Sequence, residues 1–296
     1  MPTPLLQRFA GATRYDTAVA LSRASFTTSP TVFLATGENF PDALAAGAVA
    51  GAMGAPLLLT RAHKLLDAVA DELVRLAPQT VVLVGSTTAL SAFVESLVRL
   101  RTGALVTRVG GSDRYATAAA VADLLTTPQH EVFVVCGEDF PDATAAAAAA
   151  AHCGSPLLLT RRDRVPPATL EALARRNPAT VTLVGGPDVV GPAVASTIAQ
   201  RVRPTTLQRV TGSNRYATAA AVARHVWPDG SPRALVATGE NFPDALAAGP
   251  AAALVGAPVL LTRARWTPSA TTEALRTHGT VELGIAGGTD VAHTPA

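Results

Sequence analysis

Several features that define other classes of protein are scarce in this sequence of 296 residues. Its two cysteines are too few for a disulfide framework. Lysine occurs once, at Lys64, and nearly every cation is arginine. The formal net charge is only +2, which argues against the concentrated basic face that nucleic-acid binding requires. Hydrophobic residues make up 48% and charged residues 16%, a composition typical of a folded globular chain and not of a disordered one.

Long hydrophobic segments are also lacking. The longest apolar run, residues 143–151, is interrupted by Thr144 and is much shorter than the roughly 20 residues that span a bilayer. The first 18 residues have neither a basic segment nor a long apolar segment of the kind that forms a secretion signal. The sequence therefore predicts a chain that does not insert into membranes and shows no signal peptide.

Four sequence blocks are present three times, in the same order. RFAGATRYDTA at residue 8 returns as RVGGSDRYATA at 108 and RVTGSNRYATA at 209, and TGENFPDA at 36 returns at 136 and 238. GAPLLLT and a strand ending in glycine follow in each copy. A period of about a hundred residues is too long for a solenoid repeat and predicts three small domains. We place them at residues 1–104, 105–205 and 206–296.

Short apolar runs alternate with helical segments inside each copy. In the first copy, strands are expected at 32–35, 57–59 and 81–84, and helices at 41–53, 65–76 and 89–100. Continuous apolar strands separated by helices indicate parallel sheets covered on both faces, an α/β fold. The third copy lacks the last of these helices, because only eight residues follow Gly288.

An arginine and a tyrosine recur at the start of the first helix in each copy. Thr13, Asp113 and Asn214 are good N-caps, which places Arg14, Arg114 and Arg215 at the first helical position and Tyr15, Tyr115 and Tyr216 at the second. A cation is unfavourable at that end of the helix dipole. One explanation is that the arginines and the helix N–H groups bind an anion. The alternative is that the arginines form salt bridges between repeats with Glu38, Asp42 or their counterparts, and both can hold if such a bridge lines the cleft.

The tyrosines occupy this one repeat position and no other. A tyrosine offers a flat apolar face and a hydroxyl, so the three residues predict three saccharide subsites. The alternative is that each ring packs its helix against the neighbouring unit.

The second block lies between a strand and a helix, where open α/β sheets usually bind ligands. Asn39, Asp139 and Asn241 are expected N-caps, and Asp42, Asp142 and Asp244 stand three residues later, as in a capping box. Capping alone can explain these residue types. Glu38, Glu138 and Glu240 have no such local reason.

Catalytic signatures are weak throughout. The sequence has no phosphate-binding or dinucleotide-binding glycine motif, and none of the six histidines recurs at an equivalent position. Glu38 with Asp42 is a poor metal site, since one pair of acids is little support for a divalent ion. We expect no catalytic residues, no cofactor and no metal.

These four blocks resemble the cell wall-binding repeat 2 family, and the resemblance covers essentially the whole chain. It implies Toprim-like α/β modules, Rossmann-like in having a parallel sheet between helices, that pack as an intramolecular pseudo-trimer within a monomeric chain. It also implies an extracellular module that anchors a surface protein, without covalent bonds, to the Gram-positive cell wall. The family's recurring motifs match Arg14, Tyr15, Asn39, Asp42 and their counterparts here.

We therefore expect a non-catalytic module that binds an anionic cell wall glycopolymer, such as a teichoic-acid-like or phosphorylated polysaccharide, or else peptidoglycan. Linking three weak sites can raise the affinity by roughly 10² to 10⁴. Two other classes stay open: a surface-layer or self-assembly module, and a metal-dependent phosphoester enzyme that uses Glu38 and Asp42. Family members usually carry a secretion signal and an effector domain, and neither is visible in this sequence.

Overall fold

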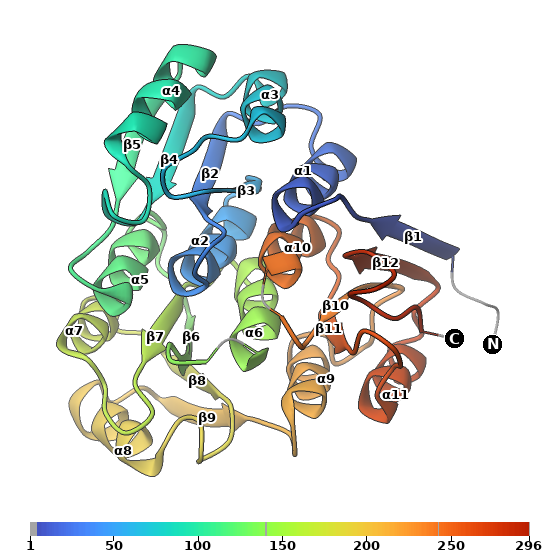
Figure 1. Cartoon of the computed structure of the whole chain (residues 1–296). Helices are drawn as coiled ribbons and strands as arrows, with labels where there is room; N and C mark the ends of the chain where they lie inside the picture. Colours follow the sequence, from blue (N-terminus) through green and yellow to red (C-terminus); the bar gives the residue numbers. More distant parts are fainter. Residues whose placement is uncertain (1–4, 140, 242, 296) are drawn as a thin grey trace.

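The computed structural model describes residues 5–139, 141–241 and 243–295. Strands and helices alternate along the chain (Figure 1). The first repeat contains β1 (Leu5–Phe9), α1 (Arg14–Ser25), β2 (Thr31–Thr36), α2 (Pro41–Ala52), β3 (Leu57–Thr60), α3 (Asp67–Leu76), β4 (Thr80–Val84) and α4 (Ala92–Thr102). The second contains β5 (Leu105–Val109), α5 (Arg114–Ala122), β6 (Glu131–Cys136), α6 (Pro141–His152), β7 (Leu157–Thr160), α7 (Pro167–Arg176), β8 (Thr180–Val184) and α8 (Pro192–Arg201). The third contains β9 (Thr206–Val210), α9 (Arg215–Val226), β10 (Arg233–Thr238), α10 (Pro243–Leu254), β11 (Val259–Thr262), α11 (Ser269–Thr277) and β12 (Glu282–Ala286).

Each of the three sheets has four parallel strands and takes one of them from the next repeat. The strand orders are β3-β2-β4-β5, β7-β6-β8-β9 and β1-β12-β10-β11. In the first sheet Leu105 of β5 lies opposite Thr80 of β4. The third sheet receives its last strand from the start of the chain, with Leu5 of β1 opposite Glu282 of β12. The three modules are therefore joined into a closed ring, and each sheet extends one strand beyond its own repeat.

Arg8 in β1 also forms hydrogen bonds with the segment that follows β12. The described residues after β12, 287–295, form turns and no helix. Arg8 Nη1 donates hydrogen bonds to the carbonyl oxygens of Gly287 (2.7 Å) and Ala292 (3.1 Å), and Arg8 Nη2 donates to Thr294 Oγ1 (2.7 Å). β1 thus completes the third sheet and fixes the segment that follows it.

Three alanine-rich helices, α2, α6 and α10, lie at the centre, and each packs against the other two (Figure 1). Gly51, Ala151 and Ala253 occupy equivalent positions in them. A Cβ atom on Gly51 would lie 2.6 Å from Ala151 Cβ and 3.2 Å from Ala253 Cβ, closer than side-chain atoms approach. Small residues are required here because three backbones meet.

In the first sheet β2, β3 and β4 are buried along nearly their whole length, as the apolar runs predicted, whereas β5, which comes from the next repeat, is partly exposed. Residues 32–35 of β2 are fully buried. In the first module α2 packs on β2, while α3 contacts β3 and α4 contacts β5. The α/β class and the parallel sheets are confirmed. Among the described residues, no helix has the length and apolar character needed to cross a membrane.

Candidate functional site at the repeat junctions

The predicted caps of the first helix in each repeat are confirmed. They are Thr13, Asp113 and Asn214. Asp113 Oδ1 accepts hydrogen bonds from the backbone N–H groups of Tyr115 (3.0 Å) and Ala116 (2.8 Å). Asn214 does the same for the equivalent groups of α9. Because the caps take these N–H groups, an anion at this site would have to bind mainly through side chains.

The arginine at the first helical position is held by the second sequence block of its own repeat. Nη1 of Arg14, Arg114 and Arg215 donates to the carbonyl oxygen of Gly37 (2.9 Å), Gly137 (2.6 Å) and Gly239 (2.5 Å), respectively. Each of these glycines directly follows a central strand, so the guanidinium lies at the carboxyl end of the sheet. Ligands bind at this edge in open α/β folds.

An aspartate of each central helix faces the next repeat across the boundary between the two repeats, here called a junction; Asp244 is buried, and Asp42 and Asp142 are half-buried. Asp42 of α2 lies near Arg114 and Thr117 of α5. Burial raises the pKa of the Asp42 carboxyl, while the Arg114 charge and a hydrogen bond with Thr117 act in the opposite direction. Burial likewise raises the pKa of Asp142 and Asp244, and each of them also has a second carboxyl nearby, Asp139 and Asp290 respectively, that acts in the same direction.

The other two aspartates have equivalent partners in the repeat that comes next around the ring. Asp142 faces Thr218 and Arg215, and Asp244 faces Thr17 and Arg14. The third junction therefore pairs the last repeat with the first. Sequence reasoning proposed an inter-repeat pair between arginine and aspartate, and the structure brings these residues together across all three junctions.

The second junction contains a pocket of about 290 Å³. Its charged lining residues are Asp139, Asp142, Asp188 and Arg215, and the N-cap residue Asn214 also contributes to its wall. The residues equivalent to Asp139 are Asn39 at the junction of the first and second repeats and Asn241 at the junction of the third and first. The residues equivalent to Asp188 are Thr88 and Asp290 at the same two junctions. With the N-cap positions Asp113 and Thr13 included, the second junction has the most negative lining of the three.

The tyrosines are buried at the same edge. Tyr15, Tyr115 and Tyr216 are 7%, 3% and 6% exposed. A Cβ atom on Gly37 would lie 2.6 Å from Tyr15 Cε1, so the ring packs directly under the loop that carries Asn39. Arg161 lies over the Tyr115 ring at 5.1 Å from its centroid, and Arg263 lies over Tyr216 at 5.4 Å. The rings form the floor beneath the junction loops.

The sequence did not predict a role for Arg161 and Arg263. Their ion pairs give a reason for the glutamate that recurs in the second block. Glu138 pairs with Arg161 (3.2 Å) and Glu240 pairs with Arg263 (3.4 Å). Glu240 Oε2 also accepts a hydrogen bond from the Ala264 N–H (3.1 Å). The signal was present in the sequence, because Arg61, Arg161 and Arg263 follow the third block in every copy.

The prediction that Asn39 caps the central helix is wrong. α2 begins at Pro41, its N-cap is Phe40, and no side chain makes a capping hydrogen bond. Proline already presets the helical φ angle and has no N–H to satisfy, which reduces the need for a cap. Asp42 then stands one position too early for a capping box and faces the junction instead. α6 and α10 begin at the equivalent Pro141 and Pro243, but the residues before them lie outside the described part of the chain.

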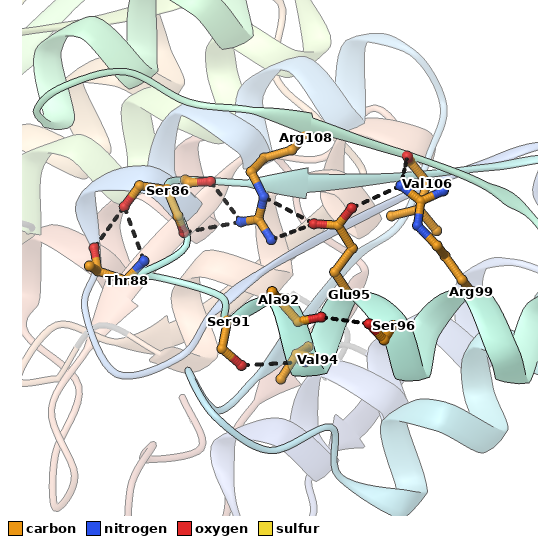
Figure 2. A network of polar contacts seen from close by, with 11 residues as sticks. Ser86, Thr88, Ser91, Ala92, Val94, Glu95, Ser96, Arg99, Val106 and Arg108 are labelled. Atoms are coloured by element: carbon orange, nitrogen blue, oxygen red, sulfur yellow. Dashed lines mark hydrogen bonds and ion pairs between the residues drawn. The ribbon is translucent and has the colours of Figure 1, made fainter.

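The first residue of the first block is an arginine in every repeat, Arg8, Arg108 or Arg209, and its side chain also binds across the junction. Arg108 Nη1 donates to the carbonyl oxygens of Gly85 and Ser86 (3.0 Å each), and its Nη2 pairs with Glu95 at 2.8 Å (Figure 2). Glu95 also accepts from Arg99 (2.8 Å). Arg209 and Arg8 bind the equivalent glycine carbonyls of the second and third modules. These arginines connect each repeat to the one before it.

The described residues contain no group of three histidine, cysteine or acidic side chains placed to hold a metal ion. What recurs at each junction is a guanidinium, an aspartate carboxyl, an N-cap side chain and an amide or carboxylate from the second block. Such a set can bind a phosphate or carboxylate and hydroxyl groups beside it.

Comparison with known proteins gives consistent matches. A family model described as Cell wall binding domain 2 (CWB2) matches residues 8–95, 108–195 and 209–294. N-acetylmuramoyl-L-alanine amidase LytC of Bacillus subtilis is 30% identical over 266 residues, 88% of this chain and 52% of the amidase. The amidase enhancer of the same organism is 32% identical over 209 residues, 71% of this chain and 28% of the enhancer. The chain thus spans about half of one relative and less of the other.

Two solved structures have the same fold. Cwp6 from Clostridium difficile superposes with a TM-score of 0.91 at 24% identity, over 99% of this chain and 49% of Cwp6. Cwp8 from the same organism gives 0.86 at 25% identity, over 97% of this chain and 50% of Cwp8.

Proposed function

Because the chain belongs to the cell wall binding domain 2 (CWB2) family, we propose that it is a non-catalytic module that binds an anionic polymer of the Gram-positive cell wall. In this proposal it acts outside the cell and holds a surface protein on the wall without a covalent bond. The modules are Toprim-like, and their closed ring acts as an intramolecular pseudo-trimer in a monomeric chain.

One observation carries the proposal: each junction places an arginine guanidinium beside an aspartate and an N-cap side chain at the ligand-binding edge of the sheet. Arg14, Arg114 and Arg215 would bind phosphate or carboxylate groups. Asp42, Asp142 and Asp244 would accept hydrogen bonds from polymer hydroxyls.

The other residues of the proposed site form the loop before the central helix and the surface beneath that loop. Asn39, Asp139 and Asn241 would contact hydroxyl groups from the loop before the central helix. Tyr15, Tyr115 and Tyr216 would support that loop from below. Three such sites on one chain bind a repeating polymer with avidity, so each can be weak while the whole chain dissociates slowly.

Co-sedimentation with purified Gram-positive cell walls tests the proposal. We expect binding to disappear after acid extraction of the anionic polymers and to weaken with added salt. Replacing Arg14, Arg114 and Arg215 by alanine one after another should reduce the affinity in steps, with a total loss of roughly 10² to 10⁴. Arg101→Ala is the control, because Arg101 is exposed on α4 and pairs only across the surface with Asp71.

The arginines also bind backbone carbonyls, so a second variant separates binding from folding. Ser213 is exposed and lines the second pocket. Ser213→Glu adds a negative charge there without removing a hydrogen bond of the fold, and it should weaken wall binding at an unchanged melting temperature. Unchanged binding to extracted walls would contradict the anionic polymer and favour peptidoglycan. Assembly of the chain without wall binding would favour a surface-layer role.

A further inference from the structure

The outer surface of α11 in the third module differs from the surfaces of α3 and α7, its counterparts in the first two modules. α4 packs against α3 in the first module, and α8 packs against α7 in the second. In the third module the described residues after β12 form no helix, so nothing among them takes this position beside α11.

The difference in exposure lies at one position of this surface. Ala70 of α3 is buried and Leu170 of α7 is half-buried, whereas Thr272, at the equivalent position of α11, is exposed. Ser269, Thr272, Glu273 and Arg276 lie at i, i+3, i+4 and i+7 and form one polar face of the helix.

An exposed tryptophan stands beside this face. Trp266 is 51% exposed, although aromatic residues are only 4% of the chain. Lys64 and Arg164 occupy its position in the other repeats. The guanidinium of Arg263 lies over the Trp266 ring at 5.0 Å from the centroid and supports one face of the indole.

The loop that carries Trp266 is held in place by several hydrogen bonds. The Arg263 N–H donates to the Trp266 carbonyl oxygen (3.3 Å), and the His293 N–H donates to the Arg263 carbonyl oxygen (2.9 Å). Thr267 Oγ1 and His293 Nδ1 lie 3.0 Å apart within hydrogen-bonding distance. The indole is therefore positioned before any ligand arrives.

Trp266 and the polar face of α11 enclose one shallow hollow, lined by Trp266, Thr267, Ser269, Thr272, Glu273 and Arg276. We propose that this hollow binds a neutral pyranose ring of a glycan. The C–H face of the sugar stacks on the indole, and its hydroxyls exchange hydrogen bonds with the threonines, Glu273 and Arg276. Glu273 and Arg276 have opposite charges, so the lining carries no net charge that would favour an anion.

This site goes beyond the junction sites and does not depend on them. It involves none of the three junction arginines, it occurs once per chain, and its ligand is uncharged. A wall glycan bound here would fix the third module on the polymer in one orientation.

The two tryptophans make the test direct. Trp227 is buried, stacks on His152, and its Nε1–H donates to the Gly256 carbonyl oxygen (2.8 Å). In a ¹H–¹⁵N spectrum of the full chain, titration with N,N′,N″-triacetylchitotriose or cellotriose should move the Trp266 indole signal in a saturable way. The Trp227 signal should stay in place and reports that the fold is intact.

Matched variants test whether the response to the sugar comes from Trp266 and the polar face of α11. Trp266→Lys, which copies the residue of the first repeat, should abolish the response to the sugar, observed at the Thr272 amide. Thr272→Leu, which copies the size of Leu170, should weaken binding by roughly threefold to tenfold through lost hydrogen bonds. Phe93→Ala removes another exposed aromatic, on α4, and should change nothing.

Two outcomes would overturn the inference. One is a Trp266 signal that neither neutral sugar moves. The other is a signal that moves only with a phosphorylated sugar, which would make the hollow an anion site. Arg14→Ala, Arg114→Ala and Arg215→Ala should leave this titration unchanged, so a failure here is distinguishable from a failure of anionic polymer binding.

Discussion

The ionised carboxyls of Asp42, Asp142 and Asp244 are disfavoured by burial, so their protonation is linked to folding. Burial raises the pKa of each carboxyl above its value in the unfolded chain, so the folded state binds the proton more tightly. The stability that this proton binding contributes is complete at low pH and is lost as the pH rises through the raised pKa.

Asp142→Asn should therefore raise the melting temperature at pH 7, because the amide removes the partly buried charge and can still accept a hydrogen bond from Thr218. The gain should shrink as the pH falls toward about 4, where the unfolded aspartate also becomes protonated. Thermal unfolding of both proteins between pH 4 and 8 checks this. A gain that is the same at both ends would contradict a titrating carboxyl.

Gly51 gives a second prediction for a single residue. A Cβ at this position would approach Ala151 Cβ to 2.6 Å, so Gly51→Ala forces the central helices apart although alanine favours helices. We expect a loss of about 1–3 kcal/mol in the free energy of unfolding, measured by urea denaturation. Gly103→Ala is a poor control because Gly103 has a positive φ angle, whereas Ser96→Ala on the exposed face of α4 should change stability little. Equal stability of Gly51→Ala and the parent would contradict close packing at the centre.

Helices and strands that have a clear pattern within one repeat were predicted from the sequence. Strand pairings between residues far apart in the chain were not. The expected helix at residues 41–53 and strand at 32–35 match α2 and β2 within two residues, because continuous apolar strands and alanine-rich helices are visible in any one repeat. The partner of β1 was not predictable in this way, since β12 lies more than 270 residues later. At the junctions, the recurrence of Arg14 and Asp42 allowed a pairing between repeats to be proposed. Which arginine meets which aspartate, such as Asp42 with Arg114, depends on how the repeats close into a ring.

Arg8→Ala tests the contribution of β1 to the third module. Arg8 donates to Gly287, Ala292 and Thr294, so its loss should release the segment after β12 and speed amide hydrogen exchange at Gly287 and His293. The cost should be about 1–3 kcal/mol, because buried carbonyls lose their donor. Exchange in α2 and α6 should stay slow, and exchange unchanged at Gly287 would show that Arg8 is dispensable.

Considered as a whole, the molecule has no module that is complete by itself. Every sheet contains a strand from another repeat, and α2, α6 and α10 share one core. We therefore expect one calorimetric transition, with the calorimetric and van't Hoff enthalpies equal, at a pH where unfolding is reversible. Three resolved transitions, or separate folding of residues 1–104, would contradict this.

The pairing of β1 with β12 also determines how the protein resists force. The two strands are parallel and adjacent, so the amino end of β1 and the carboxyl end of β12 lie at opposite ends of one ladder of hydrogen bonds. Tension between the two chain ends pulls along the strands in opposite directions and loads these bonds together, in shear, whereas a perpendicular pull would open them one at a time. A protein held at the wall while its ends are pulled would therefore unfold slowly under load, because forced unfolding is governed by the unfolding rate.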